Sequence, residues 1–131
     1  MYAGRTVVNV QTAADGTATA YAQDPDGVNL FGRVLAIHYI ADLNVPMPDA
    51  VVVTVTSEAT GEPILTATIA DGDINNYYYP RPQVQDAGAA NKTYDGTHAV
   101  GEPVTLANDR VKIAIASGGN AKKCAFHVVV G

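Results

Sequence analysis

The chain has 131 residues, of which 47% are hydrophobic and only 16% are charged, and its net charge at pH 7 is −5. This length predicts one domain with a core large enough to fold without disulfides or a structural metal. The acidic balance argues against general nucleic-acid binding, which needs a basic surface. Apolar runs are far shorter than the roughly 20 residues of a membrane helix, and the first residues lack the apolar segment of a secretory signal, so we expect a soluble cytoplasmic product.

Side chains that alternate between apolar and polar at every second residue predict β-strands along the first half of the chain. Asp15-Gly16 is a strong signal for a hairpin between the first two strands, and a second hairpin is predicted around Gly61. The segment 32–41 is apolar on both faces, which predicts a central strand covered on both sides. The predicted strands are, in chain order, 6–12, 17–23, 32–41, 50–56, 64–70 and 74–79.

The alternation of apolar and polar residues is absent from residues 80–103, which are rich in Ala, Asp, Gly, Asn and Gln. A loop of this length is unusual in a compact domain and is often functional. We expect at most one helical turn within it, over 83–90. Strand alternation resumes over 104–106, 110–116 and 122–130, and the last two segments predict a third hairpin.

These elements predict an all-β protein with about eight strands and little or no helix. Strands at this spacing are typical of an antiparallel β-sandwich with jelly-roll-like connections. We expect residues 1–131 to form one such domain. Residues 1–5 are predicted to be an N-terminal arm, and residues 80–103 a long interaction loop.

Catalytic patterns are missing from the sequence, so we expect no enzyme activity, no catalytic residue and no cofactor. Cys124 alternates with Phe126 in a strand, which predicts a small buried side chain. His38, His98 and His127 have no Cys, His or Asp partner at the spacing of metal ligands, so we expect no metal site on them.

Two Asp-x-Asp pairs are candidate calcium ligands. Asp24 and Asp26 form one pair, and Asp71 and Asp73 form the other. Asp beside Gly is common in turns, and turn formation is the main interpretation. The alternative is a calcium site shared between the two loops, because calcium takes several carboxylate oxygens.

The most distinctive local sequence is Tyr77-Tyr78-Tyr79-Pro80-Arg81-Pro82. Tyr and Arg often anchor interfaces, because they combine a large contact area with a polar tip. Tyr78 points away from its two neighbours in a strand, so at least one face of this cluster should be core. The residues predicted to bind a partner are Tyr77, Tyr78, Tyr79, Arg81, Lys92, Tyr94 and Arg5.

Charge is unevenly distributed along the chain. Residues 1–109 hold all 13 acids and four of the eight bases, a net charge of −9, and residues 110–131 hold the other four bases, a net charge of +4. Either the basic end pairs with acidic loops of the same subunit, or it attracts a neighbouring subunit or an acidic partner.

Six stretches are distinctive when taken together: 32–39, 58–65, 79–82, 108–113, 118–122 and 126–131. They resemble small all-β structural proteins from the heads of tailed bacteriophages, most of all capsid decoration (cement) proteins of jelly-roll type. The resemblance spans most of the chain, roughly from residue 30 to residue 131.

This resemblance implies a structural virion protein that binds the outside of a phage head and stabilises the lattice of the major capsid protein. It also implies self-association as a dimer or trimer and a place on the capsid exterior after synthesis in the host bacterial cytoplasm. We expect neither nucleic acid nor membrane as a partner. Two alternatives stay open: a head–tail connector or tail component, and a carbohydrate-binding β-sandwich that uses residues 77–79 and the acidic loops.

Overall fold

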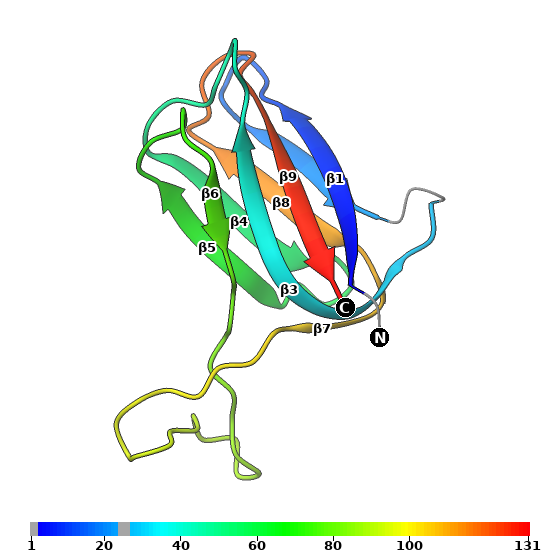
Figure 1. Ribbon diagram of the computed structural model, residues 1–131, viewed down its shortest axis with the longest axis vertical. Coiled ribbons are helices and arrows are strands. Elements are labelled where there is room, and N and C mark those ends of the chain that lie inside the picture. The colour runs from blue at the N-terminus through cyan, green and yellow to red at the C-terminus, as the bar shows by residue number, and fades with distance from the viewer. Residues whose placement is uncertain (1–2, 24–26) are drawn as a thin grey trace.

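The computed structural model describes residues 3–23 and 27–131, and these form nine strands in two antiparallel sheets without a helix (Figure 1). The antiparallel β-sandwich predicted from the sequence is therefore confirmed. The strands are β1 (Gly4–Gln11), β2 (Ala18–Ala22), β3 (Leu30–Ala41), β4 (Val51–Ser57), β5 (Pro63–Ile69), β6 (Asn76–Tyr78), β7 (Thr105–Asp109), β8 (Val111–Ala116) and β9 (Lys123–Val130). Within the described ranges, no helix is long and apolar enough to span a membrane.

The strand order is that of a jelly roll. Sheet A has the order β1-β9-β3-β6, with β7 also pairing with β3, and sheet B has the order β2-β8-β4-β5. Strands therefore pair from the two ends of the chain inward: β1 with β9, β2 with β8, β3 with β6, and β4 with β5. This wrapping closes two Greek keys around one interior.

Two of the three predicted hairpins are wrong. The pair β4 and β5 forms a hairpin, but β1 and β2 lie in different sheets, as do β8 and β9. The Asp15-Gly16 turn reverses the chain as predicted, with the Ala13 amide donating to the Thr17 carbonyl oxygen (2.9 Å), and then carries it across the sandwich. Turn chemistry specifies the reversal, whereas the choice of sheet depends on which apolar face must be buried opposite.

The core lies between the inner faces of the two sheets. Inward side chains alternate with outward ones along β4, β8 and β9, as the period of two requires. The Tyr39 and Phe126 rings meet edge to face at 5.7 Å, and the Tyr39 hydroxyl donates to the Gly72 carbonyl oxygen at 2.8 Å. The buried residues of these three strands are Val51, Val53, Val55, Ser57, Val111, Ile113, Ile115, Cys124, Phe126, Val128 and Val130.

Three further expectations need correction. β3 is central in sheet A, but only its inner face is covered: Ile37 and Tyr39 are fully buried, while His38 and Ile40 on the outer face are half-buried. The helical turn expected over 83–90 is absent from that segment. The expected N-terminal arm is shorter, because Gly4 and Arg5 already belong to β1 and lie opposite residues of β9.

One buried carboxylate joins the end of β7 to the turn after β4. Asp109 is only 6% exposed. Its carboxylate accepts hydrogen bonds from the Ser57 hydroxyl, the Ala59 amide (3.0 Å) and the Arg110 amide (2.7 Å). Burial alone would raise the pKa of the Asp109 carboxyl, but these hydrogen bonds outweigh burial and hold its pKa below the ordinary value.

We predict that Asp109→Asn lowers the free energy of unfolding at neutral pH by about 1–3 kcal/mol, because hydrogen bonds to a neutral amide are weaker than those to a carboxylate, and an amide N–H₂ replaces one of the two acceptor oxygens. The folded-state pKa is lowered, so the stabilisation is complete above about pH 4 and is lost as the pH falls further. Urea unfolding at neutral pH and at about pH 3 checks both points, because the wild type and the variant should converge in acid. Equal unfolding midpoints at neutral pH would contradict this role for Asp109.

Candidate functional site

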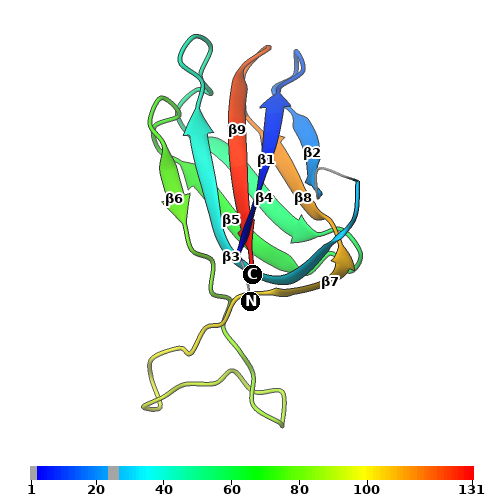
Figure 2. The same ribbon diagram turned by 45° about the vertical axis from the view of Figure 1, so that its right-hand side comes forward.

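The segment between β6 and β7 leaves the sandwich and projects beyond one end of it (Figures 1 and 2). It departs from the end of the sandwich where the C-terminus lies. Pro80 and Val104 are buried and mark its base, whereas none of the residues from 81 to 103 is buried. We call residues 81–103 the extension. It coincides closely with the loop predicted over 80–103.

The extension is ordered by its own backbone hydrogen bonds. At its base, the Glu102 amide donates to the Pro82 carbonyl oxygen (3.1 Å). Further out, Val84, Lys92 and Val100 form a closed triangle that we call the hub. In the hub, all three bonds run from a backbone amide to a backbone carbonyl oxygen: from Val84 to Val100 (2.9 Å), from Lys92 to Val84 (2.8 Å), and from Val100 to Lys92 (3.1 Å).

Two short turns project from the hub, and each is shaped by one aspartate. Asp86 accepts hydrogen bonds from the amides of Gly88 (2.8 Å) and Ala90 (3.0 Å). Asp95 accepts from the amides of Thr97 (2.9 Å) and His98 (2.7 Å) and also contacts the His98 ring. The hydrogen bonds from His98 and Thr97 lower the pKa of the Asp95 carboxyl. Local side-chain-to-backbone bonds therefore give both turns a defined shape without a core.

The second turn presents the most exposed aromatic side chain of the extension. Tyr94 is 71% exposed, and its ring stacks on His98 with a centroid distance of 5.5 Å and an interplanar angle of 18°. Lys92 lies in the hub and its side chain is also exposed. Of the residues predicted from the sequence to bind a partner, Lys92 and Tyr94 therefore stand exposed on the extension, which projects from the sandwich (Figure 1).

Arg81 and Gly101 hold the base of the extension. The Arg81 guanidinium donates to the carbonyl oxygens of Leu35 (3.2 Å) and Pro80 (3.0 Å). Leu35 lies where the register of β3 shifts against β9, so a bulge makes this carbonyl available. A Cβ atom on Gly101 would lie only 2.3 Å from the Arg81 carbonyl oxygen. Arg81, which was predicted to bind a partner, here anchors the extension to the sandwich.

We predict that Gly101→Ala disorders the extension and leaves the sandwich folded, because the added methyl group collides with backbone that cannot yield. Limited proteolysis should cut the variant within residues 83–101 faster than the wild type. Gly88→Ala is the matched control: it lies in the same extension without a positive φ, and its added Cβ would meet only Asp86 Oδ1, at an ordinary 3.4 Å. An unchanged cleavage rate in Gly101→Ala would show that the close approach does not hold the base.

A second cluster of polar and aromatic side chains lies on the outer face of sheet A. Strand register places Val7, His127, His38 and Tyr77 in one row across β1, β9, β3 and β6. Arg5 reaches up to this row: its Nη1 donates to His127 Nδ1 at 2.8 Å and lies 3.5 Å from His38 Nδ1.

The tyrosines of the sequence 77–79 divide between the two faces of sheet A. Tyr77 and Tyr79 are 56% and 61% exposed, and their rings pack edge to face on His38 at 5.0 and 6.0 Å. Tyr78 points the other way and packs against the core, where burial raises its pKa. The alternating pattern predicts that His38 and His127 lie in strands but does not indicate that they meet Arg5, because that contact depends on strand register.

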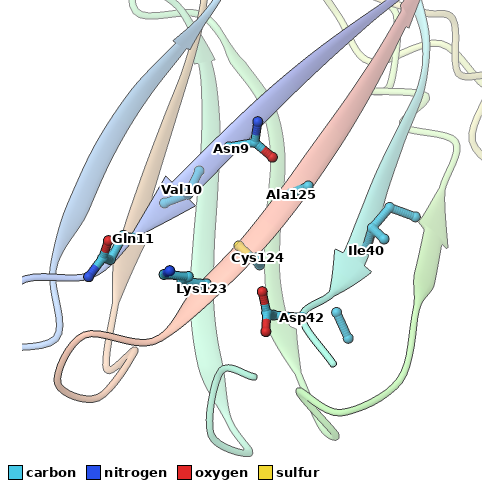
Figure 3. A pocket seen from close by; sticks show the side chains of 9 residues that line it. Asn9, Val10, Gln11, Ile40, Asp42, Lys123, Cys124 and Ala125 are labelled. Carbon is cyan, nitrogen blue, oxygen red and sulfur yellow. The ribbon is translucent and has the colours of Figure 1, made fainter. Parts of the chain in front are cut away.

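A shallow hollow of about 500 Å³ lies higher on sheet A (Figure 3). Asn9, Gln11, Asp42 and Lys123 surround it, and Ile40 and Ala125 add apolar contacts. The Asp42 carboxylate accepts hydrogen bonds from the amides of Asn44 (2.8 Å) and Val45 (3.0 Å), which lower its pKa. Cys124 also borders the hollow, but the residue is only 5% exposed, and burial raises the pKa of its thiol to about 12.

We predict that the Cys124 thiol of the folded protein reacts with a disulfide reagent far more slowly than the same thiol in urea, because the thiolate is scarce at about pH 8 and the sulfur is covered. Time courses of thiol labelling with and without denaturant check this. Rapid stoichiometric labelling of the native protein would show that the hollow exposes a reactive sulfur.

Metal-ligand geometry is missing from the part of the chain that the structure describes: no three His, Cys, Asp or Glu side chains are grouped to hold an ion. Asp71 accepts a hydrogen bond from the Asp73 amide (2.9 Å), as expected of a turn. Asp24 and Asp26, the other pair considered for calcium, lie outside the described residues. Of the bases in 110–131, Arg110 pairs with Glu58 of the same chain and lies 4.2 Å over the Tyr21 ring.

Comparison with known proteins does not indicate a function. No family model matches the chain, and no curated protein matches it. A crystal structure of FLHE is similar over 98% of this chain and 95% of that chain, with 13% sequence identity and a TM-score of 0.43. That likeness is too distant to support an argument about activity or partners.

Proposed function

We propose that the protein is a non-enzymatic structural module that attaches to the outside of a tailed-phage head through its extension and stabilises the lattice of the major capsid protein. One observation carries the proposal: none of residues 81–103 is buried, and yet the segment has a defined, hydrogen-bonded shape. The resemblance of the sequence to capsid decoration proteins supplies the kind of partner.

The energetics of the extension favour a role in binding. Ordering backbone costs about 1–2 kcal/mol per residue, and a segment without buried apolar side chains recovers little of this by packing. A preformed segment loses less conformational freedom when it docks than a disordered one does. The hub and the two aspartate-shaped turns therefore suit the extension to binding a partner.

The side chains of the extension favour a repeated, modest contact. Tyr94 and Lys92 offer one aromatic and one cationic group, and around them stand small residues such as Ala87 and Ala89, all of them exposed. Such a surface provides few strong anchors. Attachment at many equivalent positions of a lattice, aided by self-association as a dimer or trimer, would supply avidity that the single contact lacks.

The direct test replaces residues 83–101 with two glycines. The hydrogen bond between Glu102 and Pro82 already brings the ends of the cut together, so the sandwich should keep its unfolding midpoint. Co-sedimentation with purified phage heads should fall to background. Full retention of the shortened protein on heads would remove the extension from the contact, and failure of the wild type to bind any head would remove the proposed partner.

Point variants sharpen this test without changing the chain length. Lys92→Ser and Tyr94→Ser should each weaken co-sedimentation, whereas Thr66→Ser on the exposed outer face of sheet B should not. Binding to a glycan array that is lost in Tyr77→Ser would favour the carbohydrate-binding alternative. Location of the subunits at the neck or tail of a particle would favour the connector or tail alternative.

A further inference from the structure

We propose that Arg5, His38 and His127 form a pH-sensitive latch, which holds the first residues of β1 to the neighbouring strands β9 and β3 at neutral pH and releases them in acid. This inference does not depend on the proposed function, because none of the three residues lies in the extension. Its basis is the convergence of two imidazole rings on one guanidinium nitrogen.

Strand register creates this convergence. His38 and His127 lie directly opposite each other on β3 and β9, so their side chains stand next to each other on the outer face. Arg5 comes from β1, one row away along the sheet. Its Nη1 lies 2.8 Å from Nδ1 of His127 and 3.5 Å from Nδ1 of His38.

The chemistry of the contact sets the charge state of the rings. A guanidinium donates hydrogen bonds and never accepts them. Nδ1 of His127 must therefore present its lone pair, and the ring is neutral with its proton on Nε2. A second proton, on Nδ1, would point an N–H at the N–H of Arg5, so protonated His127 cannot keep this hydrogen bond. A proton on Nδ1 of His38 would face the same nitrogen.

The described strands that carry this cluster offer no carboxylate that would accommodate protonated histidines. Arg5 from β1 and His38 from β3 face His127. Tyr77 in β6 and Tyr79 just after it pack on His38, and Lys123 lies further along β9. The strands β1, β3, β6 and β9 contain no Asp or Glu. Burial, followed by the charges of Arg5 and His38, lowers the pKa of His127 below its ordinary value.

The surroundings of His38 also favour a neutral imidazole ring. Its Nε2 is buried and has no hydrogen-bond partner among the described residues. The ring is packed between the edge-to-face contacts of Tyr77 and Tyr79. A buried ring nitrogen without an acceptor is tolerated more easily on a neutral ring than on a charged one.

Release of Arg5 would act on β1 because β1 lies at the edge of sheet A and pairs there with β9 alone. At neutral pH the Arg5 side chain adds a tie from β1 to β9 and towards β3. Without that tie, residues 4–7 are held by the backbone ladder and by Val7 on the surface. The folded-state pKa of His127 is lowered, so the tie is complete above about pH 6.5 and weakens as the pH falls.

Hydrogen exchange on the full chain tests the latch. Between about pH 7.5 and about pH 5.5, amides of residues 4–8 should lose protection, after correction for intrinsic exchange, while amides of β8 keep theirs. The double variant His38→Gln/His127→Gln keeps side-chain oxygens that accept from Arg5 but cannot be protonated in this range, so its protection should not change with pH. His98→Gln, a change in the extension, should behave like the wild type.

Equal wild-type protection at the two pH values would overturn the latch, and so would a loss that persists in the double variant. A second measurement leaves both histidines in place. In Arg5→Gln, the NMR titration midpoint of His127 should rise relative to the wild type, because the cation and its donated hydrogen bond are gone. An unchanged midpoint would show that Arg5 does not hold His127 neutral.

Discussion

The rest of the structure depends on the position of β9, the last strand of the chain, between β1 and β3 in sheet A. Its inner face supplies Phe126 and Val128 to the core, and its outer face places His127 beside Arg5 and His38. Sheet A is incomplete until the C-terminal residues have joined the N-terminal strand. The same wrapping points β6, at the edge of sheet A, towards the end of the sandwich where β7 lies, so the segment between them can leave the body of the protein without interrupting either sheet (Figure 2).

The sequence predicts most of the strands and their inward-facing residues, but it does not predict which strands pair with each other. Alternation correctly predicted most strands and the burial of Cys124, because side-chain direction has a local period of two. It failed for the pairing of β1 with β2 and of β8 with β9, because a turn motif specifies a reversal and not the sheet to which the chain returns. The row Val7–His127–His38–Tyr77 was invisible for the same reason: its members come from four strands and meet only through long-range register.

The extension is a different kind of case. Its length and composition predict a long loop, but the sequence does not predict the hydrogen bonds that order this loop. The triangle of hydrogen bonds among Val84, Lys92 and Val100 joins residues whose side chains have no shared pattern. Arg81 has a role that its residue type does not reveal, because its guanidinium fixes the base of the extension. The sandwich thus supplies rigidity, and the extension supplies a preformed surface that projects from it.

The central claim is that the extension, and not a face of the sandwich, meets the partner. The most direct measurement is an image of a decorated phage head at a resolution that distinguishes the sandwich from the segment projecting from it. Our account predicts density for residues 81–103 against the outer surface of the shell, repeated at equivalent positions over the head. Density that places a sheet face on the shell, with the extension free in solvent, would contradict it.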